Sequence, residues 1–331
     1  VISGNGMERK VQTDAQGQIS VNDLLPGTYT ITEQPPASYV VPASQTILVE
    51  SGKTTTVSFA NVLKKWRATV TKKDKETETA QGDASLAGAI YGVYRGGKLM
   101  DTYTTDASGA FTTAYYPCAS DWTLREIAPS EGYLLDSAIY EMGASPGEFV
   151  LERNTIDKSV KEQVVKGRLR IVKHLDQPNG DVEMKDTPMT NAGSIEQPEA
   201  GAVFEVYLAS AGSYERAKAD ERDLLTTDTD GFAVSKELPY GNYLVHQRAG
   251  AQGQAIIPDF YVCISQQGKT YSYILNNWTL KAKLRVEKRD AETGERIAAS
   301  GIGFQIRDAA TGELVKQGID YPTPVVLDTY Y

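Results

Sequence analysis

The sequence has few of the residues that metal centres and disulfide frameworks require. It contains two cysteines and two histidines in 331 residues. Cys118 and Cys263 fall at non-equivalent places, so we interpret both as lone thiols rather than as parts of a disulfide framework. Two histidines are too few to indicate a metal centre. We therefore expect no metal and no cofactor.

Basic charge and long apolar runs are also lacking. The formal net charge is −9, which argues against a nucleic-acid binder because such a protein needs a basic face. No apolar run is long enough to span a membrane, and no charged-then-apolar leader follows Val1. The chain begins and ends within a repeat, so we interpret it as an interior piece of a longer protein.

What the sequence does contain is a repeated order of motifs. Three strand-like runs each contain a lysine, namely Lys72, Lys173 and Lys288. Each run is followed by Gly-x-x-[Tyr/Phe]-x-[Val/Ile], which begins at Gly88, Gly201 and Gly301. Self-similarity in a constant order is typical of repeat arrays. The period of roughly 100 residues lets each unit bury a core of its own.

The hydrophobic pattern has a period of two residues, which predicts strands. Short alternating runs such as residues 28–32 are separated by clusters of Gly, Pro, Asn and Asp. We therefore predict an all-β chain of tandem antiparallel β-sandwiches of the immunoglobulin-like type. Residues 213–225 are rich in Ala, Glu, Arg and Lys. They predict one short surface helix.

The repeat divides the chain into four units. Residues 1–63 form the C-terminal part of a truncated unit, and residues 64–165 form a complete second unit. Residues 166–278 form a complete but divergent third unit, with an insertion at about 177–199 that contributes to its divergence. Residues 279–331 form the N-terminal part of a fourth unit. The joints between units are short, which favours a stiff rod.

The second unit combines a strand lysine, a strand glutamate and a late asparagine: Lys72, Glu126 and Asn154. Glu33 and Asn61 of the first unit are 28 residues apart, as are Glu126 and Asn154. In a dry core the lysine pKa falls and the glutamate pKa rises. A neutral amine is a nucleophile, and a protonated carboxyl group can polarise an amide and move protons. The expected product is an amide bond between the first and last strands, with loss of ammonia.

An ordinary structural role for these residues is the alternative. A strand lysine can extend its charge to the edge of a sheet, and a glutamate can pair with it. Asparagine is common where strands end in turns. The matched spacing in two units favours the chemical interpretation.

Four motifs of the repeats resemble those of a known family. They are residues 286–294, the Gly-Ala-x-[Tyr/Phe]-x-Val-Tyr strands at Gly88 and Gly201, the turn at 105–109, and residues 124–133. These motifs resemble the SpaA-like, Cna protein B-type (prealbumin-like) domains of Gram-positive surface proteins and pilins. The resemblance covers essentially the whole chain. It implies seven-stranded sandwiches, intramolecular Lys–Asn isopeptide bonds assisted by an acidic residue, and display on a bacterial surface.

In the second unit the resemblance implies that Lys72 is the nucleophile, Glu126 the proton shuttle and Asn154 the acceptor. The first unit retains Glu33 and Asn61 but lacks its lysine. It cannot close its bond within this chain.

The third unit departs from the family pattern. Lys173 is its nucleophile, but Gln247 stands where a glutamate is expected, and a glutamine cannot supply a proton as an acid. The candidate acceptor is Asn277, which continues the alternation of Tyr273 and Leu275, and the neighbouring Asn276 is the alternative. Whether this unit crosslinks stays open. The fourth unit retains Lys288 alone.

The predicted function is a structural stalk segment of a Gram-positive cell-surface adhesin or pilin-related protein. It would be extracellular, anchored to the cell wall through regions outside this chain, with the neighbouring domains of the same chain as partners. Self-crosslinking is a single-turnover reaction, so we do not expect an enzyme. The alternative is a ligand-binding adhesin module that recognises a host matrix protein or glycan.

Overall fold

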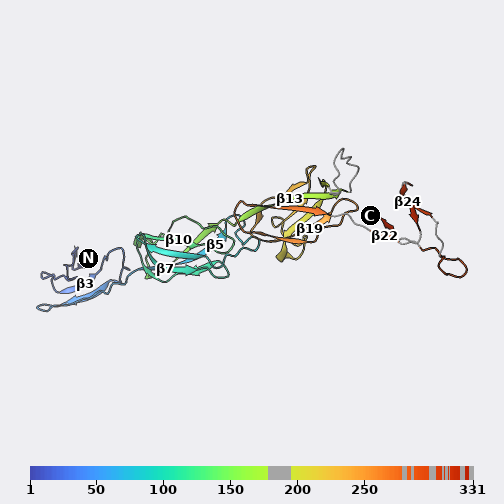
Figure 1. The fold of residues 1–331 in the computed structure, drawn as a ribbon. Helices are drawn as coiled ribbons and strands as arrows, with labels where there is room; N and C mark the ends of the chain where they lie inside the picture. The colour runs from blue at the N-terminus through green and yellow to red at the C-terminus, as the bar shows by residue number, and fades with distance from the viewer. Residues whose placement is uncertain are drawn as a thin grey trace. The chain divides into compact units, whose positions relative to one another are not determined.

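The computed structural model describes residues 1–177, 195–277, 282–284, 287–297, 303–307, 309, 312, 314–320 and 325–327. Across these residues the chain folds into strands, and the regular helical segments are two 3₁₀ turns, Pro146–Glu148 and Ala209–Ala211 (Figure 1). This confirms the all-β prediction. Contacts within the chain divide it into two compact halves, Val1–Val164 and Val165–Tyr331. The word unit is used below for the four predicted repeats. No helix of the described residues is long and apolar enough to cross a membrane.

Residues 1–63 contain one antiparallel sheet. Its order is β2 (Met7–Arg9), β1 (Ile2–Gly4), β3 (Gly27–Ile31) and β4 (Gln45–Val49). Asn5 and Gly6 join β1 to β2 with φ values of 48° and 76°, the left-handed conformation that a two-residue hairpin turn requires. Tyr29 is buried on β3, and its hydroxyl donates to the carbonyl oxygen of Leu25 at 2.9 Å.

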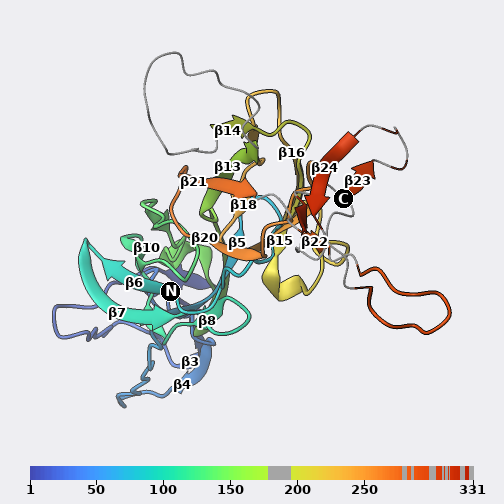
Figure 2. The same ribbon diagram turned by 45° about the vertical axis from the view of Figure 1, so that its right-hand side comes forward.

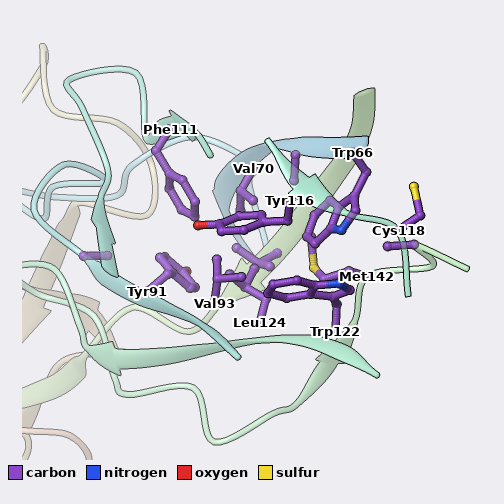
Figure 3. Close-up of a cluster of buried hydrophobic side chains, with 14 residues drawn as sticks. Trp66, Val70, Tyr91, Val93, Phe111, Tyr116, Cys118, Trp122, Leu124 and Met142 are labelled. Carbon is purple, nitrogen blue, oxygen red and sulfur yellow. The ribbon is translucent and has the colours of Figure 1, made fainter. Parts of the chain in front are cut away.

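The second unit packs two sheets face to face. The first contains β12 (Arg153–Glu162), β5 (Lys65–Asp74) and β8 (Ala110–Thr112), with β9 (Tyr116–Pro117) also paired to β5. The second has the order β11 (Tyr140–Glu141), β10 (Trp122–Ala128), β6 (Ile90–Arg95) and β7 (Lys98–Thr104). Figure 3 shows the side chains of Trp66, Tyr116 and Trp122 grouped between these strands. The centroid of the Trp122 ring lies 4.7 Å from that of Tyr116 and 5.4 Å from that of Trp66.

The first and last strands of the second unit are parallel neighbours. β5 pairs with β12 over ten positions, from Lys65 opposite Arg153 to Asp74 opposite Glu162. Antiparallel pairs dominate the rest of the unit. A bond between side chains of β5 and β12 would therefore join the two ends of the unit directly.

The third unit repeats this arrangement. One sheet contains β13 (Lys166–Gln177), β14 (Ile195–Pro198), β17 (Phe232–Val234), β18 (Leu238–Pro239) and β21 (Thr270–Asn277). The other has the order β16 (Arg222–Thr226), β15 (Val203–Leu208), β19 (Gly241–Ala249) and β20 (Phe260–Ile264). β21 lies beside β13 in parallel, as Figures 1 and 2 both show. Leu169, Ile171 and Phe204 form part of the buried core between the sheets.

The prediction of a surface helix at residues 213–225 is wrong. The segment is made of turns, and its end enters β16, where Leu225 pairs with Phe204 of β15. Most of the segment is polar and lacks a continuous apolar stripe at helical spacing, and helices this short are marginal without packing. Strand pairing therefore outweighs the local helix propensity.

The described parts of residues 279–331 form two small antiparallel pairs. β22 (Ala282–Leu284) pairs with β25 (Val325–Leu327), and β23 (Gly303–Arg307) pairs with β24 (Leu314–Asp320). Every sheet lies within one of the four predicted units, whose boundaries stay a prediction. Most of the predicted insertion at 177–199 lies outside the described residues.

Candidate functional site

Lys72 of the second unit is fully buried, with 0% of its surface exposed. It lies on β5, where burial alternates residue by residue, so Lys72 shares the core face with Trp66 and Val70. An unpaired ammonium group in such a place would be strongly unfavourable. The fold must therefore supply partners or remove the charge.

Two glutamates meet the Lys72 amine. Its Nζ lies 3.5 Å from Oε1 of Glu126 on β10 and in direct contact with Oε2 of Glu162 at the end of β12. Both carboxylates are fully buried. Oε2 of Glu126 accepts a 2.6 Å hydrogen bond from the backbone N–H of Asp136, and Oε1 of Glu162 accepts a short one from the Tyr91 hydroxyl.

Burial shifts the pKa values of this group in the directions that amide formation needs. Desolvation lowers the pKa of Lys72 to about 8, which increases its neutral nucleophilic fraction. Desolvation also raises the pKa of Glu126, which favours a protonated acid. The pKa of Tyr91 is raised for the same reason, so its hydroxyl stays a hydrogen-bond donor. The Tyr133 ring covers the Lys72 amine, and the ring centroid lies 4.5 Å from Nζ.

Asn154 does not reach Lys72, and the predicted Lys72–Asn154 pair is wrong. Asn154 lies opposite Trp66, whereas Lys72 lies opposite Val160. Six strand residues span roughly 20 Å, far beyond covalent reach. The Asn154 amide instead donates to the carbonyl oxygens of Lys65 and Leu151, both at 2.9 Å.

The third unit buries Lys173 in the same way, with 0% of its surface exposed. Its Nζ donates to Oε2 of Glu199 at 2.6 Å and to the carbonyl oxygen of His174 at 2.5 Å. The other carboxylate oxygen of Glu199 accepts from the N–H of Ala251 at 2.6 Å. The carboxyl group beside Lys173 therefore comes from Glu199, next to β14, and not from the position on β19 that the family pattern predicts.

Glu199 and two more polar side chains of the third unit converge beside Gly250. A Cβ atom at Gly250 would lie 2.5 Å from Nε2 of Gln247, 2.9 Å from Oε1 of Glu199 and 3.4 Å from Nδ2 of Asn277. Glycine is therefore the residue that leaves room for this cluster. Gln247 occupies the predicted place, and its Oε1 accepts from the N–H of Ile257 at 3.1 Å.

Asn277 is the acceptor candidate that the fold favours. It is 1% exposed, and neither atom of its amide has a hydrogen-bond partner among the described residues. It pairs with Leu175, two positions beyond Lys173 on the adjacent strand, so it shares a face with Lys173. Asn276 precedes it and therefore points to the other face.

Hydrogen bonds show which positions of the two units correspond. The Thr105 hydroxyl donates to the carbonyl oxygen of Leu86 at 2.7 Å, and the Thr227 hydroxyl donates to that of Glu199 at 2.6 Å. Glu199 therefore stands where the second unit has Leu86. Glu126 thus approaches its lysine from strand β10, whereas Glu199 approaches the equivalent lysine from the segment just after strand β14.

The remaining predicted residues lie in the truncated units. Asn61 donates its amide to Oε1 of Glu33 at 2.7 Å, so the structure brings this predicted pair together. Lys288 is exposed in the described part of the fourth unit. It is therefore not buried as Lys72 is, and no ion pair joins it to a carboxylate among the described residues of that unit.

Sequence reasoning missed Glu162 and Glu199. Asn61 lies four residues before Lys65, where β5 begins, and Glu162 lies four residues before Lys166, where β13 begins. Counting back from the next unit would therefore have found Glu162, whereas counting forward from Glu126 selected Asn154. No comparable signal marks Glu199, because its role depends on the pairing of β14 with β13.

These features define a protein of tandem prealbumin-like β-sandwiches, in which at least two units bury a lysine of their first strand. Residues 2–63 and 67–158 match the SpaA family, described as a prealbumin-like fold domain. This match confirms the resemblance in the first and second units.

Several solved structures are similar to this chain. The Bacillus anthracis TIE protein matches with a TM-score of 0.60 and 23% identity, over 83% of this chain and 46% of that chain. This chain thus spans less than half of that protein. A C-terminal fragment of the pilus adhesin SpaC from Lactobacillus rhamnosus GG is 13% identical, with a TM-score of 0.35 over 66% of this chain and 98% of that one. The minor pilin of Streptococcus agalactiae is 14% identical, with a TM-score of 0.30 over 68% and 100%. No curated protein matches the chain.

Proposed function

We propose that this chain is a stalk segment of a Gram-positive surface protein related to pilins and adhesins, and that an isopeptide bond between Lys173 and Asn277 locks its third unit. The observation behind the bond is the meeting of a buried amine, a carboxyl group and an unpaired carboxamide at one dry site. The family match and the tandem sandwiches support the structural role. Its surface location and its partner domains in a longer chain belong to the same proposal.

The reaction needs only groups of this unit. Glu199 takes a proton from Lys173 across their 2.6 Å contact, which leaves a neutral amine and a carboxylic acid. The amine attacks Cγ of Asn277, and the Cγ–Nδ2 bond breaks. Glu199 gives its proton to the departing nitrogen, which leaves as ammonia, and takes the second proton from the attacking nitrogen, so Glu199 ends as a carboxylic acid. Because the strands hold these groups together, the step is effectively unimolecular.

A bond at this place would strengthen a stalk because it joins parallel neighbouring strands. It would close a loop of about 105 residues from Lys173 to Asn277, which on the chain-entropy model stabilises by about 4.7 kcal/mol. Typical domains have a net stability of about 5–15 kcal/mol. Unlike a disulfide, an amide also resists reduction.

Peptide mapping of the full chain tests the bond. A protease digest analysed by tandem mass spectrometry should yield a branched peptide that joins Lys173 to Asn277, lighter than the separate peptides by one ammonia. Glu199→Gln should abolish it, while the exposed variant Glu237→Gln should not. Recovery of the two peptides unjoined from the folded protein would refute the proposal.

The ligand-binding alternative stays a prediction. Its candidate segment in the third unit lies mostly outside the described residues, and no described contact favours it over the stalk.

A further inference from the structure

Glu162 occupies in the second unit the place that Asn277 occupies in the third. Asn277 pairs with Leu175, two positions beyond Lys173, and Glu162 pairs with Asp74, two positions beyond Lys72. Both are buried on the last strand of their unit. The acceptor position of the second unit is therefore a carboxyl group rather than a carboxamide.

We propose that Lys72 and Glu162 condense into an amide with loss of water, and that Glu126 serves as the general acid and base. This deepens the proposed stalk function, because it gives the second unit a crosslink of its own. It would be a Lys–Glu bond, chemically distinct from the Lys–Asn bond of the third unit. Residues 72 to 162 enclose a loop of about 91 residues, comparable in entropic effect with that of the third unit.

The atoms balance without an added reactant. An ammonium–carboxylate pair has the same composition as an amine and a carboxylic acid, so proton transfer from Lys72 to Glu162 prepares both reacting groups. The Nζ–Cδ bond forms, the bond from Cδ to Oε2 breaks, and that oxygen leaves as water. Glu126 takes the proton from the attacking nitrogen and gives its own to the departing hydroxyl, so it is regenerated.

The contacts of each glutamate assign the two roles. Glu162 Oε2 touches the Lys72 amine, whereas the nearest oxygen of Glu126 lies 3.5 Å away. Glu162 Oε1 accepts from the Tyr91 hydroxyl, which would stabilise negative charge on that oxygen during attack. Glu126 is held by the backbone N–H of Asp136. Glu162 is therefore the acceptor and Glu126 the proton carrier.

Charge balance favours condensation over a permanent ion pair. One ammonium and two carboxylates would leave a net negative charge in a site where all three side chains have 0% exposure. Buried charge that is not compensated is strongly unfavourable. Condensation removes the charges of Lys72 and Glu162 and leaves one glutamate, which burial favours in its neutral form.

Peptide mapping of the full chain again supplies the test. The digest should contain a branched peptide joining Lys72 to Glu162, lighter than the separate peptides by one water. In Glu162→Gln the bond should form with loss of ammonia instead, and the branched peptide should have the same mass as in the wild type. Glu126→Gln should abolish the bond while circular dichroism shows an unchanged β-fold.

Three outcomes would overturn the proposal. They are recovery of Lys72 and Glu162 in separate peptides from folded protein, a branch from Lys72 to Glu126, and retention of the wild-type yield in Glu126→Gln. The Lys173 peptide in the same digest reports on the third unit separately. A failure of the Lys–Glu bond is therefore distinguishable from a failure of the Lys–Asn bond.

Discussion

The second and third units bury equivalent lysines but surround them with different chemistry. Four structurally equivalent pairs differ, in the order second unit then third unit: Leu86 and Glu199, Tyr91 and Phe204, Glu126 and Gln247, Glu162 and Asn277. The second unit thus has two carboxyl groups and a phenol, and the third has one carboxyl group and two carboxamides. In the proposed reactions the acid therefore acts from strand β10 in the second unit and from the segment just after strand β14 in the third.

The acceptor determines the leaving group and the number of protons needed. A carboxyl acceptor loses water and must itself be protonated, whereas a carboxamide loses ammonia and needs only the proton shared by the amine and the acid. In the proposed reactions both units convert a buried lysine into a neutral amide, the second unit with loss of water and the third with loss of ammonia. Each prediction below exchanges or removes one of their differences.

The largest expected effect is on the stability of the third unit. Asn277→Ala removes the acceptor but keeps the Lys173–Glu199 ion pair, so it isolates the contribution of the bond. The free energy of unfolding should fall by about 4–5 kcal/mol, the loop-closure value for this length. Calorimetry of the full chain measures it. Asn276→Ala is the matched control, and an equal loss in both variants would show that the bond does not involve Asn277.

Exchanging the position of the acid should remove and then restore the bond. Glu199→Leu gives the third unit the residue of the second unit at this place, and we expect no Lys173–Asn277 bond because no acid remains to move the proton. Adding Gln247→Glu supplies an acid from β19 and should recover the bond. The yield of branched peptide measures both steps. A bond that persists in Glu199→Leu would contradict the role of Glu199.

Tyr91 should matter only for the unit whose acceptor it contacts. Tyr91→Phe removes the hydrogen bond to Glu162, and losing such a donor to a buried group costs about 1–3 kcal/mol. The Lys72–Glu162 bond should therefore form about 5- to 150-fold more slowly, since 1.36 kcal/mol is a factor of ten in rate. The control is Phe204, the equivalent residue, because Phe204→Leu should leave the Lys72 bond unaffected. An unchanged rate in Tyr91→Phe would remove Tyr91 from the reaction.

The smallest effect is a difference in pH dependence. The reactive form of the second unit holds two protons among Lys72, Glu126 and Glu162. As pH rises through the raised pKa of Glu126 toward about 8, the pKa of Lys72, one proton is lost and the rate should fall about tenfold per pH unit. The acceptor of the third unit is a carboxamide, which does not have to be protonated before the attack, so its rate should lack this fall.

Chains that carry a photocaged lysine at position 72 or 173 would measure both rates. The caged chain folds without its bond, and light then starts the reaction at a chosen pH. Two rates that rose together with pH would contradict the assignment of a carboxyl acceptor to the second unit.

Much of this site could be predicted from the sequence. Alternation along the strand placed Lys72 and Lys173 on a core face, and the strand pattern placed Glu126 and Gln247 beside them, as the structure shows. The pairing of Glu33 with Asn61 also followed from spacing. In the second unit the distance from Glu126 to Glu162 is 36 residues instead of 28, because the connection between their strands is longer. Loop length varies at little energetic cost, so spacing across a loop predicts contacts poorly.

The sequence by itself determined that these units are β-sandwiches and that each complete unit buries an amine on its first strand. Those properties follow from local alternation and from the side chains themselves. Only the tertiary structure decided two of the neighbours of these lysines: Glu162 in place of Asn154, and Glu199 from outside the expected strand. The reason is that a reaction between side chains depends on strand register, and a shift of one residue turns a side chain to the opposite face of the sheet.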